Sequence, residues 1–232
     1  MSTQPRLVEV RQNVLKQNDL LARWLRQRFS DAGVYVVSLV SSPGAGKTTL
    51  LEKTLTHLKA KGCRVAALVG DLATENDAAR LARSEVPVKQ IITGTVCHLD
   101  ADMVQRSLDD WNLNELDCLF IENVGNLVCP SSYDLGEDLR IVLMSVTEGE
   151  DKPLKYPTIF NTSDVALITK TDLSEAVEFD LVGARESIQS VRPGMEIVEL
   201  SAKTGSGLDE YLEYLLKKIE SKQNMATALA RY

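Results

Sequence analysis

The sequence predicts an α/β fold of three layers, in which a mostly parallel β-sheet carries helices on both faces. Short apolar runs alternate with longer segments whose apolar residues recur at helical spacing, and this alternation is typical of a parallel sheet. The 232 residues and the hydrophobic fraction of 44% suit one α/β domain of ordinary size. In such sheets ligands bind at the carboxyl ends of the strands.

We expect the chain to divide into three parts. Residues 1–30 form an N-terminal amphipathic helical extension, residues 31–223 form the main domain, and residues 224–232 form a loosely held C-terminal tail. No internal repeat, low-complexity tract or linker to a second domain appears in the sequence. The functional residues are therefore expected in the main domain.

The first predicted element is a helix over residues 5–29. Its apolar residues recur near helical spacing, with Arg, Lys and Gln between them. These apolar residues are Leu7, Val10, Val14, Leu21, Trp24, Leu25 and Phe29. Asp31 and Gly33 follow it and end it before the first strand. Packing on the domain is the preferred interpretation, and a surface for a partner is the alternative.

Strands and helices alternate through the rest of the chain. The predicted strands are short apolar runs, and the predicted helices are longer segments with helical periodicity. The strands are expected at residues 34–41, 63–69, 88–92, 117–122, 140–146, 164–169 and 196–200. The helices are expected at residues 48–60, 74–84, 101–110, 178–191 and 208–222.

Charge and hydropathy exclude several classes of function. The formal net charge of −7 argues against nucleic-acid binding, which requires a basic face. No apolar run reaches the roughly 18 residues that a membrane span needs. The start, MSTQPRLVEVRQN, lacks the apolar centre of a signal peptide. We therefore expect a cytoplasmic protein with no membrane partner.

Residues 41–49 (SSPGAGKTT) connect the first strand to the next helix, as a phosphate-binding loop does. Gly44 and Gly46 let the backbone approach phosphate oxygens, although Ser41 replaces the opening glycine of the usual pattern. Lys47 is expected to neutralise phosphate charge and Thr48 to place its hydroxyl on Mg²⁺. The expected nucleotide contacts here are Pro43, Gly44, Ala45, Gly46, Lys47, Thr48 and Thr49. A glycine-rich turn with no ligand is the alternative to this P-loop NTPase.

Two later strand ends carry residues suited to guanine. Thr169, Lys170 and Asp172 stand where GTPases have Asn-Lys-x-Asp, and Asp172 would accept hydrogen bonds from guanine N1 and N2, which adenine lacks. Lys170 would pack over the base. The next strand ends in Ser201, Ala202 and Lys203, a third base-contacting segment. These segments favour GTP over ATP as the substrate.

The Mg²⁺ and γ-phosphate side of the site requires a carboxylate at a strand end and a mobile glycine. Glu122 and Gly125 form an E-x-x-G sequence after the strand at 117–122, and Asp71 is a second acidic candidate. We expect Thr48, Asp71 and Glu122 to hold Mg²⁺. Asp77 is a third carboxylate that is expected near the attacking water, and a solvated helix residue is the alternative.

Cys97, His98 and Cys129 form a candidate metal site. Thiolate and imidazole ligands together suit Ni²⁺, Zn²⁺ and Cu, and three ligands leave an open position. Cys129 follows Gly125 by four residues, which reach at most about 14 Å, so the metal site would be tied to the loop that senses the γ-phosphate. Inert cysteines beside a surface histidine are the alternative. Cys63 and Cys118 lie in apolar strands and are interpreted as core.

Five segments resemble the HypB family of GTPases, which help to insert nickel into NiFe-hydrogenase. The segments are SSPGAGKTTL, TGTVCHLDA, IENVGNLVCP, VTEGEDKPLKYP and SAKTGSG, and the resemblance covers nearly all of residues 34–222. The adjacent Cys97 and His98 distinguish the chain from the related urease accessory GTPases, which have Cys-Pro-His. Serine at position 41 is usual in this family.

The resemblance implies a SIMIBI-class GTPase that forms a homodimer in the GTP state. It further implies that Cys97, His98 and Cys129 bind Ni²⁺ or Zn²⁺ at the subunit interface. The implied partners are a HypA-type nickel-binding maturation protein and the NiFe-hydrogenase large-subunit precursor. Two features depart from the family. The start of the chain has neither a Cys-rich nor a His-rich nickel motif, and Thr169 replaces the usual Asn.

The sequence thus favours a metallochaperone GTPase with Lys47, Thr48 and Asp77 at the reacting phosphate. We expect slow intrinsic turnover, because Asn126 rather than glutamine follows Gly125. A regulatory GTPase switch with structural cysteines is the first alternative. A metal-storage module with an idle nucleotide site is the second.

Overall fold

The computed structural model describes residues 6–71 and 76–229 and contains one seven-stranded sheet in these residues. Every pairing in the sheet is parallel, and the strand order is β3-β2-β4-β1-β5-β6-β7. The strands are β1 Tyr35–Ser41, β2 Val65–Asp71, β3 Val88–Ile92, β4 Cys118–Glu122, β5 Leu139–Ser145, β6 Val165–Thr169 and β7 Glu196–Glu199. The predicted α/β class is confirmed, and each strand lies within two residues of its predicted bounds.

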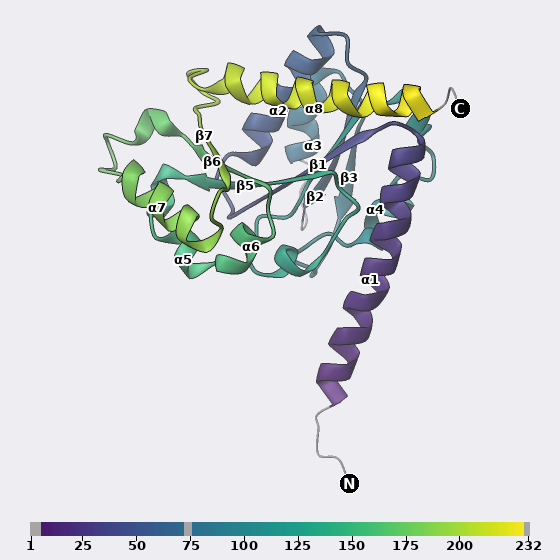
Figure 1. Ribbon diagram of the computed structural model, residues 1–232, viewed down its shortest axis with the longest axis horizontal. Helices are drawn as coiled ribbons and strands as arrows, with labels where there is room; N and C mark the ends of the chain where they lie inside the picture. Colours follow the sequence, from purple (N-terminus) through teal and green to yellow (C-terminus); the bar gives the residue numbers. More distant parts are fainter. Residues whose placement is uncertain (1–5, 72–75, 230–232) are drawn as a thin grey trace.

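The helices cover both faces of the sheet (Figure 1). They are α1 Arg6–Asp31, α2 Lys47–Ala60, α3 Asn76–Leu81, α4 Ala101–Ser107, α5 Lys152–Lys155, α6 Pro157–Asn161, α7 Leu181–Val191 and α8 Leu208–Leu229. On one face, Val37 of β1 belongs to the same buried cluster as Leu51 of α2 and Leu215 of α8. On the other face, Val36 shares a cluster with Phe29 of α1. Alternate strand residues point to opposite faces, so the side chains of β1 are buried in both of these apolar clusters.

Helix α1 is anchored to the domain from Asn18 onward, where the Asn18 side chain bonds to the backbone of Asp134 and Ala101. Leu25 and Phe29 are fully buried against the sheet, whereas Val14 and Leu20 are largely exposed. Figure 1 shows the first half extending beyond the body of the domain. The predicted helix at 5–29 therefore exists from Arg6, and its position 5 lies outside the described residues. No helix in the described part of the chain is both long and apolar enough to cross a membrane.

Four predictions about helix bounds need correction. The helix predicted to end at residue 222 continues as α8 to Leu229, through Met and Ala residues of high helix propensity, so the predicted tail at 224–232 is helical up to Leu229. Residues 230–232 lie outside the described residues. The helix predicted at 178–191 begins at Leu181, where the side chain of Asp180 caps it. The helix predicted at 101–110 ends at Ser107. The helix predicted at 74–84 consists of α3 and a 3₁₀ turn at Ala82–Ser84, and positions 74 and 75 lie outside the described residues.

Two short helices, α5 and α6, were absent from the sequence prediction. They span four and five residues, with Pro153 and Pro157 in their first turns. Segments this short give no readable helical periodicity, although proline in the first turn is compatible with a helix start. Helix α6 packs against β5 and β6 through Phe160, which is fully buried in the same apolar cluster as Val142 and Ile168.

The parallel arrangement brings the predicted site residues to one edge of the sheet. Glu122 ends β4 and pairs in register with Leu39 of β1 and Val69 of β2, so the loops after these three strands emerge together. Thr169 ends β6 beside Ser145 of β5. The carboxyl edge of the sheet therefore presents the phosphate loop, the acidic strand ends and the expected base-binding segments.

Candidate functional site

The phosphate loop joins β1 to α2 with two glycines in left-handed backbone. Gly44 has φ 75° and Gly46 has φ 100°, which side chains strongly disfavour. Lys47 is almost fully buried, and its Nζ donates to Ser41 Oγ at 2.9 Å. Burial lowers the pKa of Lys47, against the opposing charges of Glu122, Asp77 and Glu148. Ser41, which departs from the usual pattern, thus supplies a polar partner to the lysine.

Glu122 faces this loop from the end of β4. Thr48 Oγ1 donates to Glu122 Oε1 at 2.7 Å, and Glu122 Oε2 is buried with no hydrogen-bond partner among the described residues. Burial raises the pKa of Glu122 to about 7, although Lys47 and Thr48 oppose the shift, and Asp77 and Asp71 add to it. A buried carboxylate oxygen beside a threonine hydroxyl is a donor set that fits Mg²⁺.

A cavity of about 480 Å³ holds the expected phosphate-side residues together. Its polar lining includes three carboxylates at the carboxyl edge of the sheet, Asp71, Asp77 and Glu122, and the basic groups Lys47 and Lys170. The full set of sequence-predicted residues here is Pro43, Gly44, Gly46, Lys47, Thr48, Thr49, Asp71, Asp77, Glu122, Gly125 and Lys170. One concave surface thus contains every phosphate, magnesium and water-orienting candidate except the backbone of Ala45.

A second cavity of about 310 Å³ adjoins the first and contains the expected base-binding residues. It is lined by Ala45, Gly46, Thr49, Thr169, Lys170, Asp172, Ser201, Ala202 and Lys203, together with three leucines. Ser201 Oγ donates to Asp172 Oδ1 at 2.6 Å, and Lys203 Nζ lies 4.0 Å from Asp172 Oδ2. The two segments that were predicted to bind one base therefore meet around a single carboxylate.

Thr169 connects the base-binding cavity to the phosphate loop. Its buried Oγ1 donates to the carbonyl of Ala45 at 2.7 Å, and the Nζ of Lys170 donates to the carbonyl of Gly44 at 2.6 Å. Lys170 has φ 59°, a left-handed conformation that is costly for a residue with a side chain. The missing amide at Thr169 is thus replaced by a hydroxyl that still ties this loop to the phosphate loop.

Gly125 lies directly on the phosphate loop. A Cβ added at Gly125 would be 2.9 Å from the Cα of Pro43 and 3.0 Å from its nitrogen. Those distances leave no room for any side chain at this position without a backbone shift. The loop after β4 is therefore packed directly against the phosphate loop at Gly125.

Cys97, His98 and Cys129 form the candidate metal centre. One ligand atom from each lies within 4.8 Å of the other two, and the two sulfurs are 2.9 Å apart. All three are partly exposed, and both cysteines are free thiols. Burial lowers the pKa of His98, with Asp100 opposing, so the neutral imidazole that binds metals is favoured. This group of three fits a soft divalent metal such as Ni²⁺ or Zn²⁺.

Side chains that the sequence analysis did not single out support the metal centre. The ring of Tyr133 stacks on His98 with a centroid separation of 3.9 Å. Asn123 is buried, and its Oδ1 accepts from the backbone N–H of Leu99 at 3.0 Å. Both residues come from the segment after β4. Asn123 lies within the IENVGNLVCP segment without having been singled out, and Tyr133 lies outside every motif that the sequence analysis used. Cys118 is fully buried in β4, as expected, whereas Cys63 lies just before β2 and is only partly buried against the same core.

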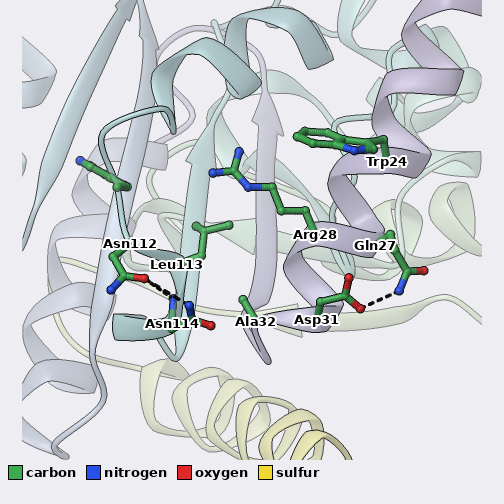
Figure 2. Close-up of a pocket in the computed structure, with 9 residues that line it drawn as sticks. Trp24, Gln27, Arg28, Asp31, Ala32, Asn112, Leu113 and Asn114 are labelled. Atoms are coloured by element: carbon green, nitrogen blue, oxygen red, sulfur yellow. Dashed lines mark hydrogen bonds between the residues drawn. The ribbon is translucent and has the colours of Figure 1, made fainter.

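A separate cavity lies at the opposite end of the sheet (Figure 2). Trp24 and Arg28 from α1 line it, opposite Asn112 and Leu113 from the segment that precedes β4. Trp111 also lines it. The guanidinium of Arg28 lies 5.6 Å from the ring centroid of Trp24. No sequence-predicted site residue lines this cavity.

Comparisons with known proteins find a family described as "CobW/HypB/UreG, nucleotide-binding domain", which matches residues 35–199. The hydrogenase maturation factor HypB of Azotobacter chroococcum mcd 1 is 44% identical over 213 residues, which are 92% of this chain and 70% of that protein. The hydrogenase/urease maturation factor HypB of Helicobacter pylori (strain ATCC 700392 / 26695) is 42% identical over 215 residues, which are 91% and 88% of the two chains.

The fold is also similar to a crystal structure of HypB from Helicobacter pylori in complex with nickel. The two structures superpose with a TM-score of 0.83 at 42% sequence identity. The match covers 89% of this chain and 97% of that chain.

The raised pKa of Glu122 predicts that the free energy of unfolding decreases as the pH rises. Its folded-state value of about 7 exceeds the ordinary 4.5, so stability falls as pH rises from about 4.5 to about 7. Without metal or nucleotide, Glu122→Gln should be more stable than wild type at pH 8, by up to about 3 kcal/mol, with the gain gone by pH 5. Urea unfolding with EDTA measures both values.

The matched control is Glu186→Gln on the exposed face of α7, which should change stability at neither pH. An equal stability difference between wild type and Glu122→Gln at pH 5 and pH 8 would contradict the assignment of a buried carboxylate with a raised pKa.

Proposed function

The chain belongs to the CobW/HypB/UreG family of nucleotide-binding domains, and from this premise we propose that it is a GTPase that delivers Ni²⁺ during hydrogenase maturation. The observation that carries the proposal is one short segment. It begins with Glu122 at the phosphate side, contacts the phosphate loop at Gly125, and ends at the thiol of Cys129. Nucleotide chemistry and metal binding therefore share one piece of backbone.

Guanine recognition rests on Asp172. Its carboxylate would accept from guanine N1 and N2, held in place by the hydroxyl of Ser201. The aliphatic part of Lys170 would cover the base while its Nζ stays on the carbonyl of Gly44. A backbone N–H near Ala202 would meet guanine O6. Adenine offers the opposite hydrogen-bonding pattern at these positions, so the site selects GTP.

Hydrolysis is transfer of the γ-phosphoryl group of GTP to water. The water oxygen bonds to the γ-phosphorus, the bond to the β,γ-bridging oxygen breaks, and GDP and phosphate leave. Lys47 and the N–H groups of residues 44–49 would stabilise the charge that develops on the phosphoryl oxygens. Asp77, which lines the same cavity, would orient the water and accept its proton. Mg²⁺ held by Thr48, Glu122 and Asp71 would supply further charge neutralisation between the β- and γ-phosphates.

Nickel is the cargo in this proposal. The thiolates of Cys97 and Cys129 with the imidazole of His98 would bind Ni²⁺, and Zn²⁺ would compete for the same ligands. Three ligands leave a coordination position open to exchange or to a second subunit. We propose a homodimer in the GTP state, loading by a HypA-type nickel-binding protein, and delivery to the NiFe-hydrogenase large-subunit precursor. The hydrogenase maturation role named for the relatives supports this assignment.

The guanine assignment predicts a change of base specificity. Asp172→Asn replaces two acceptor oxygens by one acceptor and one donor, and the retained oxygen still accepts from Ser201. GTP affinity should fall about 10- to 100-fold, because charged hydrogen bonds are lost. Xanthosine triphosphate, whose 2-oxygen accepts hydrogen bonds, should bind better than it binds wild type. Fluorescent-nucleotide titration measures both constants, and unchanged GTP affinity would contradict the role of Asp172.

The metal assignment predicts that nickel binding depends on both thiols. With a non-hydrolysable GTP analogue present, Cys97→Ala/Cys129→Ala should lose the nickel that wild type binds. Cys63→Ala, at a half-buried thiol outside the cluster, should bind like wild type. Isothermal titration with Ni²⁺ measures stoichiometry and affinity. Unchanged nickel binding by the double variant would leave a regulatory GTPase switch with structural cysteines as the better assignment.

A further inference from the structure

The side chain of Asn126 bridges the two cysteine-bearing segments. Its Nδ2 donates to the backbone carbonyl of Cys97 at 3.1 Å, and its Oδ1 accepts from the backbone N–H of Val128 at 2.9 Å. Val128 immediately precedes Cys129, so one amide group holds both thiol-bearing stretches of backbone. The two sulfurs lie 2.9 Å apart beside this bridge. The planar amide supplies the donor and the acceptor from two different atoms of one rigid group.

Asn126 also adjoins the contact with the phosphate loop. Gly125, the preceding residue, touches Pro43 so closely that no Cβ fits between them. On the other side of Gly125, Asn123 accepts from the backbone of Leu99. The loop that contains Cys97 is therefore bonded to the segment after β4 both before and after its point of contact with the phosphate loop.

We propose that Asn126 is the positioning residue that transmits the nucleotide state to the nickel ligands; this inference rests on the proposed function. When Gly125 moves with the γ-phosphate, the adjacent amide moves with it. Because the amide is bonded to Cys97 and to Val128, its displacement shifts one thiol-bearing segment relative to the other. The separation of the ligand atoms, and with it the affinity for nickel, then follows the nucleotide.

This assignment also explains why the residue after Gly125 does not act on water. Both polar ends of the Asn126 side chain are occupied by backbone groups of the metal-binding segments. The position that would carry a water-orienting glutamine in a fast GTPase is used instead to hold the metal centre.

The test compares nickel affinity in two nucleotide states, with the full chain bound to GDP or to a non-hydrolysable GTP analogue. Asn126→Asp keeps the acceptor for Val128 but turns an oxygen toward the carbonyl of Cys97, and Asn126→Ala removes both bonds. Wild type should show nickel dissociation constants that differ at least about fivefold between the states. In both variants the ratio should fall to within twofold of one, with affinity lowered roughly 10- to 100-fold in the tighter state.

Asn112→Asp is the matched control, because Asn112 makes a similar side-chain bond to backbone, to the N–H of Asn114, in an exposed loop far from the site. It should keep the wild-type ratio. The inference is overturned if the Asn126 variants keep that ratio, including the case in which nickel binds more weakly by the same factor in both states, as a purely structural residue would cause. A wild-type ratio of one, or nickel retained by Cys97→Ala/Cys129→Ala, would instead overturn the proposed function and this inference with it.

Discussion

Gly125 packs on Pro43 with no space for a side chain, and the behaviour of the whole site depends on that contact. This close packing restricts the position of the segment after β4 relative to the phosphate loop. Upstream, the same segment holds Glu122, bonded to Thr48 of the phosphate loop. Downstream it holds Cys129, within ligand distance of Cys97 and His98. A single glycine contact therefore lies, along the chain, between the carboxylate of the nucleotide cavity and a thiol of the candidate metal centre.

The buried charged groups of the nucleotide cavity, Lys47 and Glu122, hydrogen-bond to neutral hydroxyls rather than to each other. Lys47 and Glu122 are both buried, yet Lys47 bonds to Ser41 and Glu122 to Thr48, and one oxygen of Glu122 has no partner among the described residues. Burial disfavours the charged form of each group, as the lowered pKa of Lys47 and the raised pKa of Glu122 show. Phosphate oxygens and a divalent cation would supply the missing opposite charges. The charged groups of the cavity therefore suit a polyanion with a bound divalent cation. Burying Lys47 and Glu122 without such a ligand lowers the stability of the folded chain.

The sheet and the site residues were predictable from sequence because their signals are local. Buried parallel strands are continuous apolar runs, and the phosphate loop, the base-binding segments and the pair Cys97–His98 are short motifs at strand ends. The helical end of α8 was missed because the last residues of a chain were expected to be loosely held, although Met225, Ala226 and Ala228 favour a helix. The hydroxyl bond from Thr169 to Ala45, the stacking of Tyr133 on His98 and the bridge made by Asn126 could not be predicted. Each joins residues that are far apart in sequence or that match no motif, so only the fold reveals their partners.

In the proposed function, nucleotide hydrolysis and nickel release are one event. A single-turnover experiment tests this directly: the full chain is loaded with Ni²⁺ and GTP, phosphate is recorded with a phosphate sensor, and free nickel is recorded with a chromophoric chelator. Nickel should appear with the rate constant of phosphate release, and a non-hydrolysable GTP analogue should hold the nickel in place. Phosphate release that leaves nickel bound, or equal nickel release with the analogue, would contradict the coupling of hydrolysis to nickel release.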